Sequence, residues 1–345
     1  MGGGEGNGWL IAVRHNPRPH DAHLIQTKRM NKNLPCVALL SKGLNLRSLA
    51  DAFTAVAPGI DLRMGPDLGN LTDIDVAVCW FPVHGQLAGL PNLQLVQSLA
   101  AGIDHLVADP DLPRHLPLCR IVDATMAAGM KAYVCWAVVQ QHRGMAAYVA
   151  SSAASRWEEQ PVVSPRGHRV GIAGLGTLGL ACAEALATIG YPVRGWSRSA
   201  KAGLPAGVTG FHGDDQLDEF LSGCDTLVCL LPLTPETHGF LNAALFAKLP
   251  RGAHLINVGR GDHLVEADLL PALDGGQLAA ATLDTFTQEP LPPGHPFWGD
   301  ARILVTPHIA TRTDRLVIAQ QTLANLAALQ RGERPSSQVD IDRGY

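Results

Sequence analysis

Three polar residues, Arg260, Glu289 and His308, lie in short segments that follow apolar runs of the type expected for a buried strand. The runs are 254–258, 279–284 and 303–306. An imidazolium can donate a proton near neutral pH, and a neighbouring carboxylate keeps the ring charged and oriented. A guanidinium can bind a carboxylate or stabilise a developing oxyanion. Each residue alone could be structural, but their positions at successive strand ends favour one site that binds a small carboxylic acid and protonates an oxyanion.

A glycine-rich loop lies earlier in the chain and indicates a dinucleotide site. It reads Gly174-Leu175-Gly176-Thr177-Leu178-Gly179, after an apolar strand and before a helix. Gly174 permits a tight turn, Gly176 lets the backbone approach a pyrophosphate, and Gly179 lets the helix pack close to the strand. The pyrophosphate would meet the N–H groups at the positive end of that helix. The alternative is a glycine-rich turn without a ligand, which the flanking strand and helix disfavour.

The residues after the next strand, 192–196, indicate which dinucleotide binds. An NAD site usually has Asp or Glu about 20 residues beyond the first glycine, where it holds the ribose hydroxyls. This chain has no acid there, but it has Ser197, Arg198, Ser199 and Lys201. These side chains could bind a 2′-phosphate, although they could also be solvated loop residues. We expect NADPH to be preferred, with NADH as a possible second cofactor.

Short apolar runs alternate with helical stretches in two parts of the chain, which predicts two doubly wound α/β domains with parallel sheets. In the first part the expected strands are 36–41, 60–63, 76–80, 94–98 and 120–122. In the second part they are 169–173, 192–196, 226–230, 254–258, 279–284 and 303–306, the six strands of a dinucleotide domain. Helices are expected at 46–57, at 126–150 as one long connecting helix, and at 314–331, with a polar linker at 151–165.

We expect a Rossmann-type cofactor domain at 146–314, inserted into a flavodoxin-like substrate domain made of 30–145 and 315–345. Residues 1–29 are polar and rich in glycine, with no apolar segment of the kind found in a secretory signal. The simplest interpretation is a disordered extension or a start codon placed too far upstream, and a targeting role is the alternative.

Composition excludes several classes of function. The net charge of −4 over 345 residues and a pI of about 6.4 argue against nucleic acid or an anionic membrane as a partner. Seven cysteines occur without a C-x-x-C pair, which indicates reduced thiols in a cytoplasmic protein and no zinc site. Apolar stretches end well before about 18 residues, so no transmembrane helix is expected. No metal is expected.

Together these motifs resemble the D-isomer-specific 2-hydroxyacid dehydrogenase family, and within it the NADPH-dependent glyoxylate/hydroxypyruvate reductases. The matching segments are Leu99–His105, Gly174–Gly179, Trp196–Ser199, Asn257–Gly261, Gln288–Pro292, Thr306–Ala310, Gln338–Asp340 and Arg343–Tyr345. The resemblance covers about 35–345. It implies that Arg260 anchors the substrate, that Glu289 orients His308, and that His308 donates the proton.

The same resemblance implies further site residues. Backbone N–H groups of Ala101 and Gly102 would bind the substrate carboxylate, although a plain loop is the alternative. Trp80 and Met126 would wall the substrate pocket, although either could be ordinary core. Cofactor-lining positions would be Leu231, Pro232, Val258, Gly259 and Asp284. Ala132 stands where relatives often carry Glu, which leaves the substrate preference open.

The implied activity is the NADPH-dependent reduction of glyoxylate to glycolate and of hydroxypyruvate to D-glycerate. A homodimer is implied too, with the helix at 126–150 contributing to its interface. The alternatives are a different 2-oxo acid substrate, or a non-catalytic, cofactor-sensing binding protein like the corepressors of this fold. The complete set of Arg260, Glu289 and His308 favours catalysis.

Overall fold

Two parallel sheets organise residues 34–341, the part of the chain that the computed structural model describes. The extension expected at 1–29 and the tail segment Arg343–Tyr345 lie outside these residues. Within 34–341 the parallel-sheet α/β fold predicted from the sequence is confirmed.

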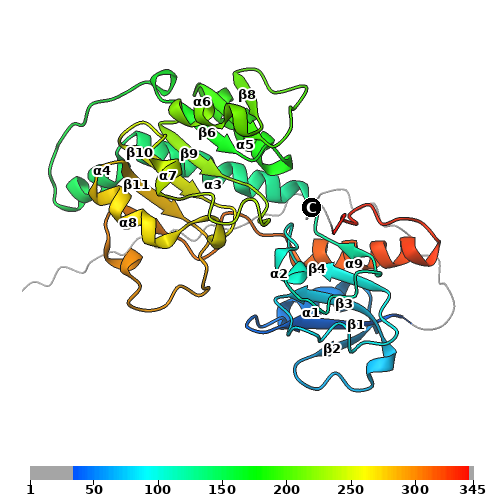
Figure 1. Cartoon of the computed structure of the whole chain (residues 1–345). Helices are drawn as coiled ribbons and strands as arrows, with labels where there is room; N and C mark the ends of the chain where they lie inside the picture. The colour runs from blue at the N-terminus through cyan, green and yellow to red at the C-terminus, as the bar shows by residue number, and fades with distance from the viewer. Residues whose placement is uncertain (1–33, 342–345) are drawn as a thin grey trace, which may run out of the picture. The chain divides into compact units, whose positions relative to one another are not determined.

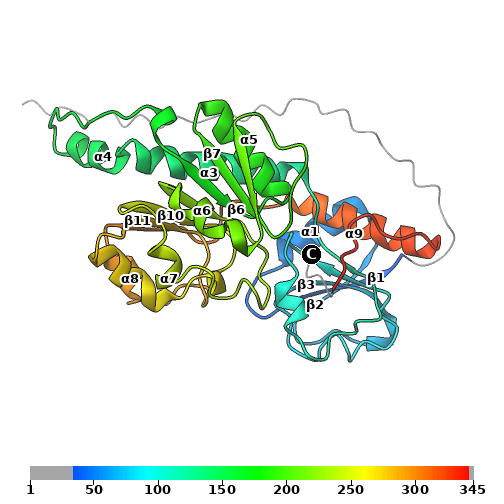
Figure 2. The same cartoon turned by 45° about the horizontal axis from the view of Figure 1, so that its top comes forward.

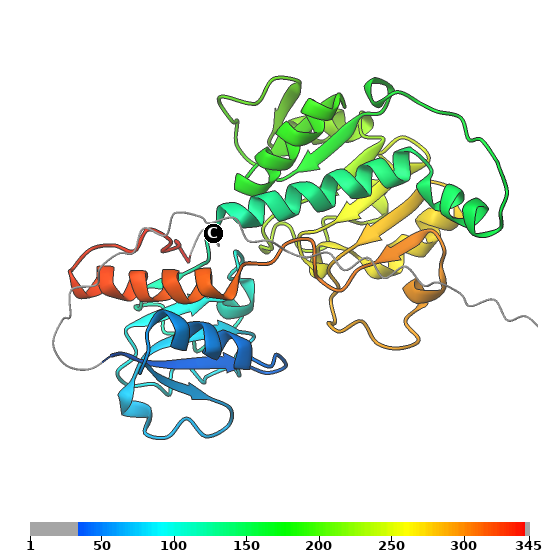
Figure 3. The same ribbon diagram turned by 180° about the vertical axis from the view of Figure 1, so that it is seen from behind.

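The first sheet has five strands in the order β2-β1-β3-β4-β5, which is the flavodoxin-like order (Figure 1). Its strands are β1 (Cys36–Ser41), β2 (Asp61–Met64), β3 (Ile74–Trp80), β4 (Leu95–Ser98) and β5 (Leu118–Cys119). Helices α1 (Arg47–Val56) and α9 (Arg315–Gln330) lie side by side on one face, as Figure 3 shows, and α2 (Asp104–Val107) follows β4. Helix α9 therefore joins the C-terminal end of the chain to strands formed near its beginning.

Side chains of β1 explain why this sheet is covered on both faces. Val37 and Leu39 are buried with α1 and α9, whereas Ala38 and Leu40 belong to the core on the opposite face. Since neighbouring residues of a strand point to opposite faces, a strand covered on both sides is apolar at every position. That is the pattern from which the strand was predicted.

The second sheet has seven parallel strands in the order β12-β11-β10-β9-β6-β7-β8. They are β6 (Val170–Ala173), β7 (Val193–Ser197), β8 (Val208–His212), β9 (Thr226–Cys229), β10 (Ala253–Asn257), β11 (Leu278–Leu283) and β12 (Ile303–Val305). The order reverses between β6 and β9, where dinucleotides bind in doubly wound sheets.

Helices cover both faces of this second sheet. They are α3 (Ala124–His142), α5 (Thr177–Ile189), α6 (Leu217–Ser222), α7 (Ala243–Phe246) and α8 (Glu266–Asp274). A further helix, α4 (Met145–Ala153), follows α3 and is mostly exposed. Helices α3 and α5 pack side by side on one face, and α6, α7 and α8 contribute to the core on the other (Figures 1 and 3). Single 3₁₀ turns are η1 (Leu71–Asp73), η2 (Pro165–Gly167), η3 (Asp214–Gln216), η4 (Gly261–His263) and η5 (Pro296–Gly299).

Four expectations about elements were wrong. The second sheet has a seventh strand, β8, at its edge, and β5 lies at Leu118–Cys119 and not at 120–122. The helix expected at 126–150 is divided into α3 and α4, which Figure 2 shows as separate helices. Gly144 separates them in the left-handed conformation, with φ of +59°, and α4 continues into the segment expected to be a linker. A left-handed residue ends the hydrogen-bond ladder of a helix, and glycine adopts that conformation without a steric penalty.

Candidate active site

The glycine-rich loop joins β6 to α5 at the point where the strand order of the second sheet reverses. Gly174 has φ of +109°, and a Cβ there would lie 2.6 Å from the carbonyl oxygen of Leu230. A Cβ on Gly179 would overlap the carbonyl group of Gly174. The first and third glycines are therefore required by the backbone itself.

Gly176 differs from the other two glycines, because a Cβ there would meet no protein atom within 4 Å. Gly176 is the N-cap of α5, and no side chain caps the N–H groups of this helix end. The first turn, which begins with Thr177 and Leu178, contains no acidic residue. The first N–H groups of a helix have no partners inside the helix and carry its positive dipole end. Open space and uncapped donors at one helix end fit a bound pyrophosphate.

The four expected selectors of NADPH lie at and just beyond the end of β7. Ser197 is buried, and its hydroxyl donates to the carbonyl oxygen of Ser199 over 2.9 Å. Arg198, Ser199 and Lys201 are exposed. Ser197 thus shapes the turn, and the charged side chains stand on its outer side, where a phosphate could be bound.

His308 and Glu289 are paired as the sequence predicts. His308 Nδ1 lies 2.9 Å from Glu289 Oε2, and the other carboxylate oxygen accepts the N–H of Phe286 over 3.0 Å. Burial alone would raise the pKa of Glu289, but the hydrogen bond and charge of His308 and the N–H of Phe286 outweigh it, so this pKa lies below its usual value. The Nδ1–H of His308 then faces the carboxylate, which leaves Nε2 for a substrate.

The loop that carries His308 is held by the buried carboxylate of Asp284. One oxygen accepts from Thr306 Oγ1 at 2.6 Å and from the N–H of Ile309 at 2.8 Å, and the other accepts from the N–H of Ala310 at 2.8 Å. Between these hydrogen-bonded residues His308 has φ of +52°, a backbone conformation that residues other than glycine rarely adopt. Asp284 was expected to line the cofactor; the structure gives its carboxylate the further task of fixing this strained loop.

Arg260 follows β10 and pairs with Asp104 of α2. Its Nε donates to both oxygens of Asp104, at 3.0 and 3.1 Å, and its Nη1 donates to the carbonyl oxygen of Gly259 at 2.8 Å. A Cβ on Gly102 would overlap Nη2 of Arg260. The guanidinium therefore lies directly against the backbone of Gly102, and Nη2 is its nearest atom to that residue.

The loop with Ala101 and Gly102 follows β4. Ser98 Oγ donates to the carbonyl oxygen of Gly102 at 2.7 Å and accepts the N–H of Ala100 at 3.1 Å, which fixes the loop. Within the described residues the N–H groups of Ala101 and Gly102 donate to no protein acceptor. Two such N–H groups beside a guanidinium can bind a carboxylate.

Trp80 and Met126, the two expected walls of the substrate pocket, lie in different surroundings. The Trp80 ring lies 5.9 Å from the ring of His308 and 5.0 Å from that of His105. Met126 is buried in the core beneath α1 and α9, and its carbonyl oxygen accepts from Thr311 Oγ1 over 2.8 Å. The structure thus brings Trp80 to the candidate catalytic histidine, whereas the side chain of Met126 is part of the core.

The remaining cofactor-lining candidates lie on the loops after β9 and β10. Leu231 and Val258 are buried, and the carbonyl oxygen of Pro232 accepts from Thr237 Oγ1 at 2.7 Å. A Cβ on Gly259 would lie 2.8 Å from Nδ1 of His263. Both loops therefore lie at the edge of the sheet that also carries Gly174 and Arg260.

Two contact residues of the site had been given no role at the sequence level. Asp104 lies inside a motif segment, and only its distance from Arg260 reveals its role as a carboxylate partner. His263 lies three residues after Arg260 and is fully buried, with both ring nitrogens near polar atoms of the site loops. No sequence signal singled out His263, because it follows Arg260 and Asp262 in a polar stretch of the chain.

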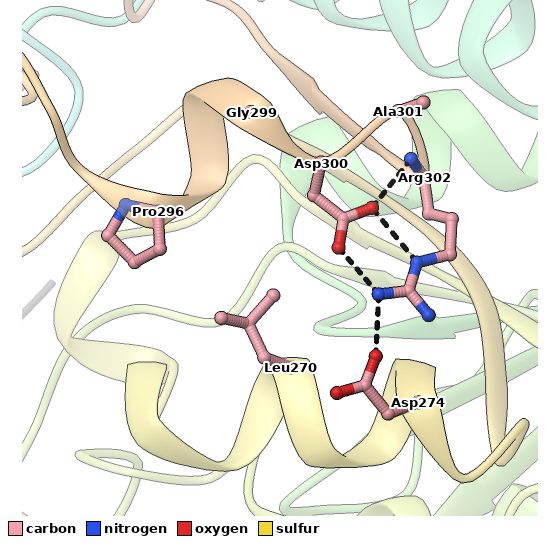
Figure 4. A pocket seen from close by; sticks show the side chains of 7 residues that line it. All are labelled: Leu270, Asp274, Pro296, Gly299, Asp300, Ala301 and Arg302. Atoms are coloured by element: carbon pink, nitrogen blue, oxygen red, sulfur yellow. Dashed lines mark hydrogen bonds and ion pairs between the residues drawn. The ribbon is translucent and has the colours of Figure 1, made fainter.

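Surface hollows lie away from this site. One of about 400 Å³ beside η5 and α8 contains Arg302, whose guanidinium is neutralised by Asp300 and Asp274 (Figure 4). Another of about 370 Å³ includes His168 and His254, at the amino ends of β6 and β10, on the opposite edge of the sheet from Arg260. Neither contains a residue of the candidate site.

Other kinds of site are not found in the described part of the chain. Between residues 34 and 341 no group of three or more His, Cys, Asp or Glu side chains is arranged to hold a metal ion. None of the helices in that range has the length and apolar character needed to cross a bilayer. The seven cysteines are free, and six of them are buried.

Comparison with known proteins places this geometry in a family. Residues 135–310 match the family described as D-isomer specific 2-hydroxyacid dehydrogenase, NAD binding domain. A glyoxylate/hydroxypyruvate reductase A of Yersinia enterocolitica is 41% identical over 285 residues, which cover 80% of this chain and 90% of that protein. A reductase of the same name from Serratia proteamaculans is 43% identical over 282 residues, with the same coverage.

Solved structures agree with this result. A D-isomer specific 2-hydroxyacid dehydrogenase of Xanthobacter autotrophicus Py2, in complex with NADPH and MES, superposes with a TM-score of 0.82 at 40% identity and covers 90% of this chain and 99% of its own. An NADPH-dependent glyoxylate/hydroxypyruvate reductase of Sinorhizobium meliloti, in complex with NADP and sulfate, superposes with a TM-score of 0.84 at 36% identity. The superposition covers 90% of this chain and 100% of the reductase.

Proposed function

The chain belongs to the D-isomer specific 2-hydroxyacid dehydrogenase family, and from this premise we propose that it reduces small 2-oxo acids, glyoxylate and hydroxypyruvate above all, with NADPH. It is an NAD(P)-dependent oxidoreductase. One observation carries the proposal: His308 and Glu289, whose Nδ1 and Oε2 atoms are 2.9 Å apart, lie on the same sheet edge as Arg260. The guanidinium of Arg260 lies against the backbone of Gly102. Three of the relatives named above are glyoxylate/hydroxypyruvate reductases.

The proposed division of labour follows from the charges. A bound nicotinamide coenzyme would supply the hydride that reduces the carbonyl carbon. Arg260 and the N–H groups of Ala101 and Gly102 bind the substrate carboxylate and polarise the neighbouring carbonyl oxygen. His308 Nε2 delivers a proton to that oxygen, while Glu289 stabilises the imidazolium through Nδ1. A Trp80 ring beside His308 limits the size of the group attached to the carbonyl carbon.

For the cofactor we propose that Gly174, Gly176 and Gly179 with the first turn of α5 hold the pyrophosphate. Ser197, Arg198, Ser199 and Lys201 hold the 2′-phosphate, which makes NADPH the preferred cofactor. Leu231, Pro232, Val258 and Gly259 line the remainder. The exposure of Arg198, Ser199 and Lys201 and the open space around Gly176 support this assignment.

We propose further that the protein is a cytoplasmic homodimer, with 30–145 and 315–345 as substrate domain and 146–314 as cofactor domain. The packing of α9 on the first sheet supports the discontinuous division. Exposed apolar side chains on α3, α4 and the following segment support a subunit interface there: Trp136, Met145, Val149, Trp157, Val162 and Val163. Trp157 is 95% exposed, which is unusual for the side chain with the largest apolar surface.

The test is a panel of 2-oxo acids of increasing size with NADPH and with NADH, run on the wild type and on His308→Ala. We expect glyoxylate and hydroxypyruvate to be reduced best with NADPH, and His308→Ala to lower kcat by about 10²–10⁴-fold. Absence of NADPH-dependent reduction of any 2-oxo acid by the wild type would refute the proposed activity. Near-normal turnover by His308→Ala would refute the role of His308.

A further inference from the structure

His263 is a fully buried histidine that the proposed reaction does not use directly. Its exposed fraction is 0%, and it ends the single turn η4 that begins after Arg260. Its backbone is fixed, because the N–H of Leu241 donates to the carbonyl oxygen of His263 over 2.8 Å. A buried polar side chain is stable only when its polar atoms are paired, so the partners of this ring determine what it can do.

Both ring nitrogens have partners on loops of the candidate site. Nδ1 accepts the backbone N–H of Arg260 at 2.9 Å. Nε2 lies 3.3 Å from the carbonyl oxygen of Pro232, which can only accept, so Nε2 carries the proton. The ring is therefore neutral, in a single tautomer. Burial lowers the pKa of His263, in agreement with a ring that stays uncharged.

The two partners belong to different loops of the sheet edge. Arg260 follows β10, and Pro232 follows β9. Gly259 leaves room for the ring, since a Cβ on that residue would lie 2.8 Å from Nδ1 and 3.0 Å from Cε1 of His263. An aliphatic side chain of similar volume could fill the space, but it would leave the partly buried N–H of Arg260 unpaired.

We propose that His263 is a positioning residue, whose imidazole ring joins the Arg260 loop to the Pro232 loop. The ring thereby fixes the distance between the guanidinium of Arg260 and the cofactor-lining backbone at Pro232. The proposal rests on the function proposed above for Arg260 and Pro232. A direct catalytic role does not follow, because neither nitrogen is left to contact a substrate.

The two hydrogen bonds can be separated by substitution. In His263→Asn the new side-chain amide oxygen can take the place of Nδ1, which retains the acceptor for Arg260 and loses the donor to Pro232. In His263→Gln the longer side chain can place an amide N–H where Nε2 stands, which retains the donor to Pro232 and loses the acceptor for Arg260. His263→Ala removes both.

The expected result is a split between two binding properties. His263→Asn should keep KM for the 2-oxo acid within about threefold of the wild type and weaken NADPH binding about tenfold, measured by fluorescence titration. His263→Gln should show the reverse, with near-normal NADPH binding and a KM raised about tenfold or more. His263→Ala should lose both, with kcat/KM lowered about 10²-fold, as misplaced catalytic groups commonly do.

A readout that needs no turnover is amide hydrogen exchange of a peptide covering 259–262. His263→Gln should expose the Arg260 N–H to exchange, whereas His263→Asn should leave it protected. The matched control is His254→Gln, a change at another buried histidine, which lies near the amino end of β10 and whose Nε2 lies 3.0 Å from Thr282 Oγ1. It should lower thermal stability without a change in KM or NADPH affinity.

The outcomes are distinct. If His263→Asn and His263→Gln lose substrate and cofactor binding to the same degree, in proportion to their loss of thermal stability, His263 is merely structural and the proposal fails. If the wild type reduces no 2-oxo acid, the proposed function fails, while NADPH titration and amide exchange still test the two loops. If the exchange of the Arg260 N–H is equal in all variants, the proposed link between the loops is wrong.

Discussion

The Glu289 carboxylate holds a charge beside His308, and this pairing predicts a pH effect. The pKa of Glu289 lies below its usual value, so the carboxylate is charged near neutral pH and can stabilise positive charge that develops on the neighbouring ring. Glu289→Gln retains an acceptor for Nδ1–H and removes only the charge. The alkaline limb of the kcat/KM profile should therefore move to lower pH, by about one unit or more. Superimposable profiles for the two enzymes would contradict the pairing.

Arg198 is the residue to change for cofactor preference, since it stands exposed just after β7. A guanidinium–phosphate contact contributes about 1.5–3 kcal/mol, so Arg198→Ala should raise KM for NADPH roughly 10- to 100-fold. KM for NADH should change little, because NADH has no 2′-phosphate. Lys248→Ala offers a control, as it removes a surface cation that pairs with Asp218 away from the glycine loop. Equal losses with both cofactors would place Arg198 outside the phosphate site.

At the scale of residues, the position of a side chain could be predicted where that side chain follows a buried strand. Arg260, Glu289 and His308 each follow a buried strand, and the structure brings them to one sheet edge. Asp104 could not be assigned a role, because its partner Arg260 is 156 residues away in sequence. The role of His263 depends on which ring nitrogen faces which loop, and no sequence pattern encodes that.

At the scale of elements, Gly261 shows how closely two loops of the site approach each other. A Cβ there would overlap the backbone of Phe286 and Thr287, in the segment that leads to Glu289. Backbone cannot move aside as a flexible side chain can, so Gly261→Ala must displace the Arg260 loop or the Glu289 loop. We expect kcat/KM to fall about 10²-fold, with stability lowered by about 1–3 kcal/mol.

The control for that change is Gly299→Ala, because a Cβ at Gly299 would meet no protein atom within 4 Å. It should leave kcat/KM and the melting temperature nearly unchanged. Steady-state kinetics and thermal unfolding of both variants separate the two effects. Wild-type kinetics in Gly261→Ala would show that the close approach of the loops has no part in catalysis.

The elements that were predicted well are those buried on both faces. Strand β6 is apolar throughout, and β10 is buried at every position, with an apolar centre at Leu255 and Ile256. Strand β8 is an edge strand with one buried side chain, Phe211, so its sequence lacks such a run. The division of α3 from α4 depends on the conformation of Gly144, whose weakening effect on a helix is visible in sequence, but whose left-handed geometry is not.

At the scale of the whole molecule, the two-sheet architecture could be predicted because strand and helix patterns alternate twice along the chain. The placement of α9 on the first sheet could not be read from that alternation, since it requires a return of the chain to its first domain. The burial of individual histidines distant from the site, on which the pH dependence of stability rests, is visible only in the folded structure.

Those buried histidines predict how stability depends on pH. His254 is 2% exposed, and burial lowers its pKa from about 6.5 to about 3. Between these values the unfolded chain binds a proton that the folded chain does not, so this contribution to stability is fully present above about pH 6.5 and is lost as the pH falls. One pH unit corresponds to about 1.4 kcal/mol, which gives a loss of up to about 2 kcal/mol at pH 5 from His254 alone.

Urea unfolding followed by circular dichroism at pH 7.5, 6.5, 5.5 and 5.0 measures this dependence. His105, whose burial lowers its pKa to about 4, adds to the same slope. Acidic groups with lowered pKa values, such as Glu289, act mainly below about pH 4.5, so the range above pH 5 isolates the histidines. His254→Gln removes one titrating group and should flatten the slope between pH 7.5 and 5.0 while lowering stability at pH 7.5. An unchanged slope in this variant would show that His254 is protonated in the folded protein as readily as in the unfolded chain.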